Sequence, residues 1–219
     1  MILSFDVWNT LLSANPEFKA ARIQEIMRLS DLPKVTVQIK MRDTKRILDF
    51  MQEETGNAFT SLFCWKLFLK NCGYSGDIDS MAEILLDTSN YLFTKHPPHF
   101  DVELVKVIRK MKKNMSHISA IVLVSNTNFV PGSVLWSTCF EHLDLFDNAY
   151  FSDQEGYAKP HFGAFTKGWP VSLGYGVPKG SIIHIGDTIA TDGAAVEHGA
   201  EFMLVSNPAD TLKRLTEML

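Results

Sequence analysis

The fold class of this chain is decided by the stretch Ile2-Leu3-Ser4-Phe5-Asp6-Val7-Trp8-Asn9-Thr10. Its first four residues form a short, mostly apolar run, which is typical of a strand buried on both faces of a parallel sheet. An aspartate follows directly, where such a strand ends and a loop begins. The stretch therefore predicts a strand over 2–5 that presents the carboxylate of Asp6 as a nucleophile at the end of the sheet.

Four further short runs rich in apolar or β-branched residues follow, and helical patterns come after them. The predicted strands are Ala120 to Val124, Ala149 to Phe151, Ser181 to Ile185 and Phe202 to Val205. The predicted crossover helices are Val134 to His142, Phe162 to Gly168, Thr191 to His198 and Ala209 to Met218, and Pro170 should break or kink the second of them near Trp169. Alternating strands and helices indicate an α/β fold with a parallel sheet.

The interval between the first two strands is far longer than the dozen or so residues that a crossover needs. It contains several helical patterns, which predict an inserted bundle of helices. They begin at Asn15-Pro16-Glu17 and continue over Thr36 to Met51, Thr60 to Asn71 and Ser80 to Phe93. The third pattern, with Phe59 just before it, is apolar nearly all round, so it should lie at the centre of the bundle. A further helix that starts at Asp101 leads to the second strand.

Composition narrows the class of protein. The chain has 219 residues, of which 46% are hydrophobic and 21% are charged, and its formal charge is −4. This balance gives no attraction to nucleic acid or to an anionic membrane, and no apolar run approaches the roughly 18 residues that cross a bilayer. Met1 leads straight into the first strand without a basic leader, and the three cysteines are odd in number and lack zinc spacing. We expect a cytoplasmic protein, monomeric or homodimeric, that acts on a small molecule.

Polar side chains follow the ends of the other strands as well. Ser125 and Asn126 follow the second strand, and the hydroxyl of Ser125 could hold a phosphate oxygen. Lys159, extended by the proline after it, could neutralise an anionic substrate and an aspartyl intermediate. Because the carboxyl ends of parallel strands share one crevice, Ser125 should lie near Asp6.

A pair of acids follows the fourth predicted strand. Gly186 lets the backbone approach closely, and Asp187 and Asp192 come after it. With Asp6 they form an oxygen-rich pocket suited to Mg²⁺. Each of these pieces alone has an ordinary explanation in turns or helix caps. Their order along the chain, carboxylate, hydroxyl, lysine and carboxylate pair, indicates one active site.

At these residues the chain resembles the haloacid dehalogenase-like (HAD) hydrolase superfamily, helical-cap subgroup. The resemblance implies a Rossmann-like core of residues 1–13 and 99–219, with sheet order 3-2-1-4-5, and an all-helical cap over 14–98 that acts as a mobile lid. It implies that Asp6 forms a covalent intermediate, while Ser125 and Lys159 bind the transferring group. It further implies that Thr10 and Asn126 help to bind a phosphate. The implied Mg²⁺ ligands are Asp6, the carbonyl of Trp8 and Asp187, with Asp192 in support.

Trp8 departs from this pattern. Phosphatases of the superfamily usually carry an aspartate here, which protonates the leaving oxygen, whereas dehalogenating members carry an aromatic residue but lack the acidic metal pocket. The chain keeps that pocket at Asp187. A Mg²⁺-dependent phosphatase acting on a small phosphorylated metabolite is therefore favoured. A 2-haloacid dehalogenase-like enzyme and a catalytically silent binding protein are the alternatives.

Some other polar residues fit structural roles better. His184 lies inside a predicted strand, which favours a core histidine with satisfied hydrogen bonds, or one that supports a site residue, over a catalytic one. One helical segment of the insertion carries several cations, which mostly form a solvated face although one could reach the substrate. They are Lys40, Arg42, Lys45 and Arg46.

Overall fold

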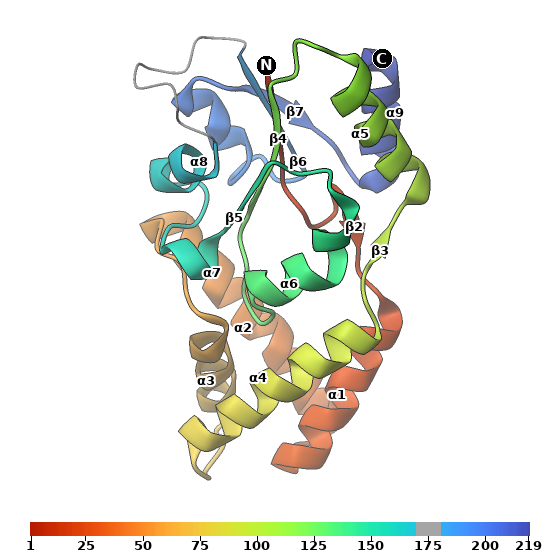
Figure 1. The fold of residues 1–219 in the computed structure, drawn as a ribbon. Helices are drawn as coiled ribbons and strands as arrows, with labels where there is room; N and C mark the ends of the chain where they lie inside the picture. Colours follow the sequence, from red (N-terminus) through yellow and green to blue (C-terminus); the bar gives the residue numbers. More distant parts are fainter. Residues whose placement is uncertain (170–180) are drawn as a thin grey trace.

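A computed structural model describes residues 1–169 and 181–219, which include a five-stranded parallel sheet (Figure 1). The strands are β1 (Ile2–Phe5), β4 (Ala120–Ser125), β5 (Asn148–Phe151), β6 (Ile182–Gly186) and β7 (Glu201–Leu204). Their order is β5-β4-β1-β6-β7, so β1 lies at the centre of the sheet. The predicted α/β class and the predicted order 3-2-1-4-5 are both confirmed.

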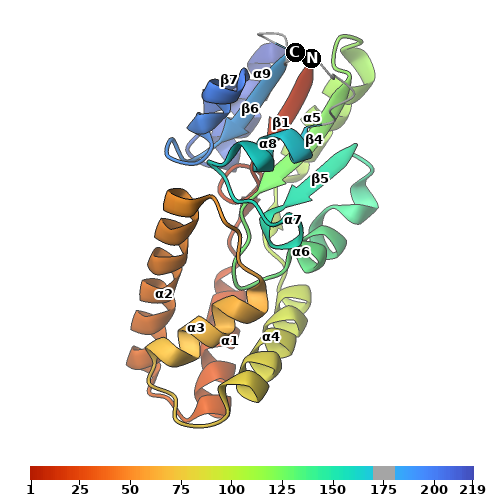
Figure 2. The same cartoon turned by 90° about the vertical axis from the view of Figure 1, so that its left-hand side faces the viewer.

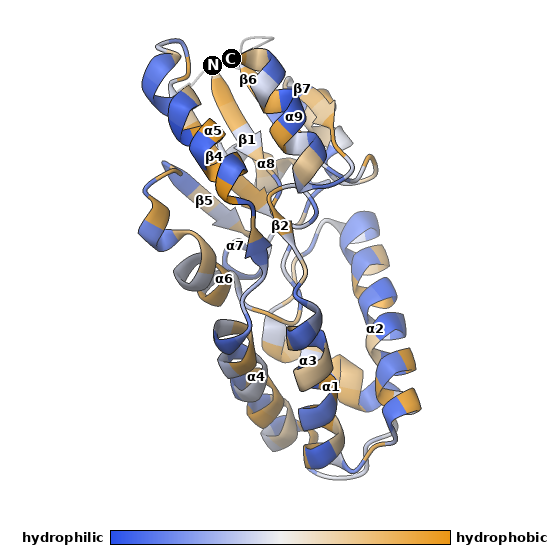
Figure 3. Cartoon of the chain, turned by 90° about the vertical axis from the view of Figure 1, so that its right-hand side faces the viewer, coloured by the Kyte–Doolittle hydropathy of each residue, from blue (hydrophilic) through white to orange (hydrophobic). Residues whose placement is uncertain are grey.

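Helices cover both faces of the sheet because successive strand residues point to opposite sides. On one side, Leu3 and Phe5 of β1 belong to a core that includes residues of three helices, α5 (Val102–Asn114), α6 (Gly132–Cys139) and α9 (Pro208–Met218). On the other side, Ile2 packs in a second core with α8 (Phe162–Gly168) and the 3-10 segment η2 (Gly193–His198). Figure 3 shows β1 and β4 largely in hydrophobic colours.

Two of the predicted crossover helices can be compared with the structure in detail: one is a 3-10 segment, and the other ends where it was predicted to end. The helix predicted over Thr191 to His198 is the shorter 3-10 segment η2, which starts after Asp192 because that side chain is held in the site described below. The helix predicted to end near Trp169 is α8, which ends at Gly168 with Trp169 as its C-cap. Pro170 itself lies outside the described residues. Two short segments, η1 (Glu141–Leu143) and α7 (Ser152–Glu155), flank β5.

The long interval after β1 forms a bundle of four helices, seen below the sheet in Figure 2. They are α1 (Pro16–Ser30), α2 (Lys34–Thr55), α3 (Ser61–Asn71) and α4 (Ile78–Lys95). The chain crosses into and out of the bundle through two short antiparallel strands, β2 (Leu12–Ser13) and β3 (His99–Phe100). The domain boundaries at 14–98 and the movement of this bundle as a lid stay predictions.

α3 joins the bundle to the sheet. Its Trp65 and Phe68 are fully buried, as the apolar pattern predicted. The indole nitrogen of Trp65 donates a hydrogen bond of 3.2 Å to the carbonyl of Phe129, in the loop after β4, and the two rings lie 4.9 Å apart. The bundle therefore packs on the loop that leaves the carboxyl end of β4. Among the described residues, no helix is both long and apolar enough to cross a membrane.

Candidate active site

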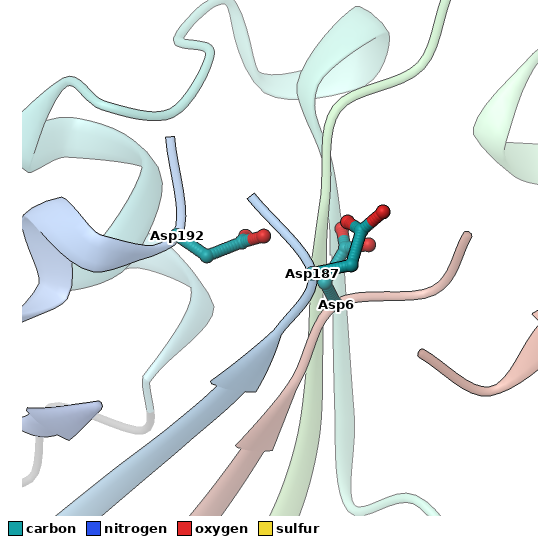
Figure 4. Close-up of side chains that lie close together, drawn as sticks. All are labelled: Asp6, Asp187 and Asp192. Atoms are coloured by element: carbon teal, nitrogen blue, oxygen red, sulfur yellow. The ribbon is translucent and has the colours of Figure 1, made fainter. Parts of the chain in front are cut away.

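Three carboxylates meet at the carboxyl ends of the central strands (Figure 4). Asp6 directly follows β1, Asp187 directly follows β6, and Asp192 returns from the loop beyond it. One oxygen of each lies within 4.8 Å of an oxygen of both others. The structure therefore brings together the three acids that the sequence analysis assigned to one pocket, and their role as a metal site stays a prediction.

Lys159 is the cation among these acids. Its ammonium donates hydrogen bonds of 2.7 Å to Oδ1 of Asp6 and 2.5 Å to Oδ1 of Asp192, and the residue is only 1% exposed. The side-chain amide of Asn126 fixes the backbone of Lys159 on both sides. It accepts from the lysine N–H at 2.7 Å and donates to the lysine carbonyl at 2.9 Å. Asn126 therefore positions Lys159, a role that the sequence did not reveal.

Asp192 is held by a chain of buried hydrogen bonds. Ser4 and His184 are register partners on β1 and β6, and the Ser4 Oγ lies 2.9 Å from the His184 Nδ1. The Trp169 indole donates to that Oγ at 3.0 Å, which leaves the Ser4 hydroxyl proton for Nδ1. His184 Nε2 then donates to Oδ1 of Asp192 at 3.2 Å. His184 is thus the core histidine with satisfied hydrogen bonds that was expected, and Ser4 and Trp169 are partners that the sequence did not show.

Gly186 makes room for this carboxylate. A Cβ atom added at this position would lie 2.3 Å from the Cγ of Asp192, which is closer than non-bonded atoms approach. The second oxygen of Asp192 accepts from the backbone N–H of Thr188 at 3.0 Å. Both oxygens of Asp192 are therefore occupied by protein donors. This arrangement fits the expected supporting role of Asp192 better than direct coordination of a metal.

Burial and crowding set the protonation of the site. Burial raises the pKa of Asp6 to about 7, helped by the charges of Asp192 and Asp187 and opposed by the ammonium of Lys159. Burial alone would also raise the pKa of Asp192, but Lys159 and His184 outweigh it and hold that pKa below its ordinary value. Burial disfavours the charged form of Lys159, yet the two adjacent carboxylates raise its pKa. Of the two carboxyls that Lys159 binds, Asp6 is thus the one whose pKa is raised.

The donor set fits a hard divalent cation. Three carboxylates face one ammonium, so the pocket has an excess of negative charge and of oxygen ligands, which Mg²⁺ prefers. Asn9, in the left-handed region at φ 56°, donates 2.9 Å to Asp187 and orients that carboxylate. The carbonyl oxygen of Trp8 accepts no hydrogen bond from the part of the chain that the structure describes. Asp6, Asp187 and this carbonyl are the groups that would hold the ion.

Thr10 and Ser125 lie away from the open part of the site. The side chain of Thr10 is fully buried, and its hydroxyl has no partner among the described residues. The hydroxyl of Ser125 donates over 3.4 Å to the carbonyl of Asn126, and the residue is 1% exposed. Neither residue lines the cavity described next. Their roles in binding phosphate stay predictions.

A cavity of about 460 Å³ lies between the three acids and the helical bundle. α2 lines one side with Lys45 and Asp49, which form an ion pair of 2.5 Å, and Asp49 also accepts from Asn128 of the core at 3.2 Å. Of the four cations noted on this helix, Lys45 alone lines the cavity, and Asp49 pairs with it.

The opposite side of the cavity is aromatic. The Trp8 ring lies 6.3 Å from the ring of Phe93 on α4, and Phe93 lies 5.3 Å from Phe18 on α1. The guanidinium of Arg22, one turn further along α1, lies 4.7 Å from the centre of the Phe18 ring. We call Trp8, Phe93 and Phe18 the aromatic wall. Trp8, the residue at which the sequence departs from the phosphatase pattern, therefore lines the surface that a ligand would contact.

Comparison with known proteins supports the fold. No protein-family model and no curated protein sequence matches the chain. A structure of the HAD-hydrolase YfnB from Bacillus subtilis, bound to magnesium, matches with a TM-score of 0.65 and 15% identity over 100% of this chain and 97% of that chain. A 2-haloacid dehalogenase from Pseudomonas syringae pv. Tomato DC3000 matches with a TM-score of 0.61 and 16% identity, over 99% of this chain and 98% of that one.

A HAD phosphatase from Thermococcus onnurineus also matches, with a TM-score of 0.58 and 15% identity over 93% of this chain and 85% of that chain. These matches confirm the resemblance inferred from the sequence at the level of the fold. They include both phosphatases and dehalogenases, so they leave the choice of reaction to the residues of the site.

Proposed function

We propose that this chain, which has the fold of the HAD-like hydrolases, is a Mg²⁺-dependent phosphatase that forms an aspartyl-phosphate on Asp6. The observation that carries the proposal is the cluster of Asp6, Asp187 and Asp192 around a single ammonium, that of Lys159. A pocket with this excess of carboxylates would repel an anionic substrate unless a cation were bound. Bound Mg²⁺ would neutralise charge on the phosphoryl oxygens, which is the main requirement of phosphoryl transfer.

The side chain of Asp6 is oriented for attack. Lys159 binds its Oδ1, while its Oδ2 has no hydrogen bond from any described residue. Attack by Oδ2 on the phosphorus forms a P–O bond to the aspartate and breaks the ester P–O bond, whose electron pair leaves with the alcohol oxygen. Water then attacks the phosphorus and the P–Oδ2 bond breaks, so that its electron pair restores the carboxylate of Asp6 and the inorganic phosphate leaves with the oxygen and protons of the water. The ammonium of Lys159 stays near the carboxylate throughout and binds the transferred group.

Trp8 limits which substrates react quickly. Its indole cannot protonate the leaving oxygen, and a general acid is often worth about 10² to 10⁴ in rate. Asp49 and Glu53 of α2 line the same cavity, but Lys45 and Asn128 bind Asp49, and Glu53 is exposed to solvent. The enzyme therefore favours esters whose oxygen leaves without protonation, such as aryl phosphates.

A 2-haloacid dehalogenase is the second candidate, and Trp8 is the observation that favours it. A halide needs no proton on leaving, so an aromatic residue at this position would cost that reaction nothing. The acids oppose it because three carboxylates would repel a carboxylate substrate in the absence of a metal. The third candidate is a catalytically silent protein, which would bind phosphate or Mg²⁺ but hydrolyse no substrate.

The test compares both reactions on the purified protein. An activated aryl phosphate and a set of 2-haloacids are each supplied with Mg²⁺ and with EDTA, and the Asp6→Asn variant is the control. The proposal predicts phosphate release that requires Mg²⁺ and is lost in the variant. Halide release that is indifferent to EDTA would replace the phosphatase with the dehalogenase. A rise in melting temperature with Mg²⁺ or phosphate, without any hydrolysis, would indicate the silent protein.

A further inference from the structure

Arg22 lies on the wall of the active-site cavity and has no ion-pair partner among the described residues. Its side chain is partly buried, and its buried Nε atom has no hydrogen-bond acceptor in the part of the chain that the structure describes. Within the described residues, no carboxylate lies within 4.0 Å of its guanidinium, and no hydrogen bond from it to a protein group is present. The guanidinium instead lies over the face of Phe18, at 4.7 Å from the ring centre.

An unpaired guanidinium in such a place is unfavourable in the free protein. Arginine is seldom buried unless it is paired, because five N–H donors lose water without gaining acceptors. Burial lowers the pKa of Arg22 to about 10, which still leaves the group charged at neutral pH. The other cations of the same cavity differ from it. Lys19 is exposed to solvent, Lys45 is paired with Asp49 at 2.5 Å, and Lys159 is paired with Asp192 at 2.5 Å.

The aromatic wall connects this cation to the reaction centre. Trp8 stands two residues after Asp6, and each step from Trp8 to Phe93, to Phe18 and to Arg22 measures 4.7 to 6.3 Å. A ligand held at Asp6 would therefore lie along an apolar surface that ends at the guanidinium of Arg22, whose N–H donors form a planar fork. Such a fork matches the two oxygens of a carboxylate.

We propose that the substrate is a phosphorylated carboxylic acid, whose carboxylate binds Arg22 while its apolar spacer packs on Trp8, Phe93 and Phe18. This inference rests on the proposed phosphatase function, and it adds the chemistry of the part of the substrate that does not react. Arg22 is a binding residue for that part. It completes its hydrogen bonds only when the substrate is present, which explains why the protein keeps an unpaired cation there.

The test uses substrates that differ in one charge. 4-Carboxyphenyl phosphate and its homologues with one or two extra methylenes are each compared with the corresponding carboxamide, which has nearly the same shape. The carboxylate should be preferred in kcat/KM by about tenfold or more for at least one spacer length. In Arg22→Met the preference should disappear, because the carboxylate and its carboxamide then meet the same uncharged side chain. Arg22→Lys should keep part of the preference because it keeps the charge but loses the fork.

Arg28→Met is the matched control. Arg28 lies on the same helix, but its side chain is 66% exposed and bound to Glu25, and it does not line the cavity. It should leave the preference unchanged, which separates a local contact from a change in overall charge. Thermal unfolding gives a second readout. Arg22→Met should melt at the same temperature as the unmodified protein or higher, since an unpaired buried cation is removed. A clear loss of stability would indicate a structural arginine and overturn the proposal.

Binding to the Asp6→Asn variant separates this inference from the proposed function. If the protein hydrolyses both members of each pair equally and Arg22→Met changes nothing, the inference fails and the phosphatase stands. If no compound is hydrolysed, calorimetry with Asp6→Asn decides between two results. Tighter binding of a carboxylate than of its carboxamide, lost on adding Arg22→Met, upholds the inference without the phosphatase. Equal binding, or no binding, overturns it.

Discussion

The two sides of the active-site cavity are built on opposite principles. On the side of the sheet, every charged group has protein partners: Lys159 binds Asp6 and Asp192, and His184 completes the second carboxylate. On the side of α1, the surface is aromatic and its partly buried cation, Arg22, has no partner among the described residues. Charges that are bound before the substrate arrives fix geometry for a reaction, whereas a charge left without a partner is available for recognition. In the proposed function, the sheet therefore performs the chemistry and the helical bundle selects the substrate.

Exchange of the two cations for methionine tests this difference most strongly. Lys159→Met leaves two buried carboxylates without their cation, which should lower the free energy of unfolding by about 3 to 5 kcal/mol. It should also lower kcat by about 10³-fold or more, since the charge next to the nucleophile is lost. Arg22→Met should change neither quantity appreciably. Urea unfolding measures the stability of both variants, and aryl phosphate hydrolysis measures their kcat. Equal losses of stability in the two variants would contradict the difference between the two sides of the cavity.

Gly186→Ala tests how tightly the sheet side is packed. The added methyl would meet the Cγ of Asp192 at 2.3 Å, so we expect a loss of about 1 to 3 kcal/mol in stability and a lower kcat. Gly193→Ala is the matched control because its nearest atoms would lie 3.5 Å away, an ordinary contact. The control should stay within about 0.5 kcal/mol of the unmodified protein. Similar unfolding midpoints for the two variants would show that the position of Asp192 is not constrained.

Trp8→Asp tests the boundary between the two sides. Trp8 is part of the aromatic wall, yet it occupies the position at which an acid would assist the leaving group. An aspartate there should raise the hydrolysis of alkyl phosphates relative to aryl phosphates by about 10- to 100-fold, because only the alkoxide needs a proton. Trp8→Asn removes the ring without adding an acid and is the control. The same gain in both variants would assign the effect to space in the cavity.

The pH dependence of Mg²⁺ affinity is a smaller effect that reports on Asp6. Burial raises the pKa of Asp6 to about 7, so below that pH a proton competes with the ion. Mg²⁺ affinity should rise about fivefold from pH 6 to pH 7 and about twofold more above pH 7 before it levels off, as calorimetry would detect. The folded protein binds this proton more strongly than the unfolded chain, so the metal-free protein should lose stability as the pH rises from 3.8 to about 7. Asp6→Asn should abolish both trends, and an affinity that does not vary with pH would contradict the shift.

The sequence predicts the sheet side better than the side of the helical bundle. Strands such as 2–5 are visible as apolar runs, and in a parallel sheet their carboxyl ends must meet, so the sequence alone groups Asp6, Lys159 and Asp187. The register that places Ser4 beside His184, and the reach of Trp169 to Ser4, depend on tertiary packing that no local pattern encodes.

Arg22 shows why recognition residues are harder to find. On the sequence it is one of several cations on amphipathic helices, and the segment with Lys40, Arg42 and Arg46 has more positive charge. What distinguishes Arg22 is that it is partly buried without a partner among the described residues, and that property follows from how α1 packs against α4 and α2 in the bundle. Tertiary contacts also explain why the helix predicted over Thr191 to His198 is shorter in the structure. Asp192 is held in the site by its hydrogen bonds, and the 3-10 segment starts only after it.

The covalent intermediate gives the most direct test that Asp6 is a phosphatase nucleophile. Protein mixed with an aryl phosphate and Mg²⁺ is quenched in acid within one turnover, digested and analysed by mass spectrometry. We predict that the peptide containing Asp6 gains the mass of one phosphoryl group, that Asp6→Asn shows no gain, and that Arg22→Met still does. Turnover of the phosphate without this adduct, or an ester of a 2-haloacid on Asp6 formed with release of halide, would contradict the proposed function.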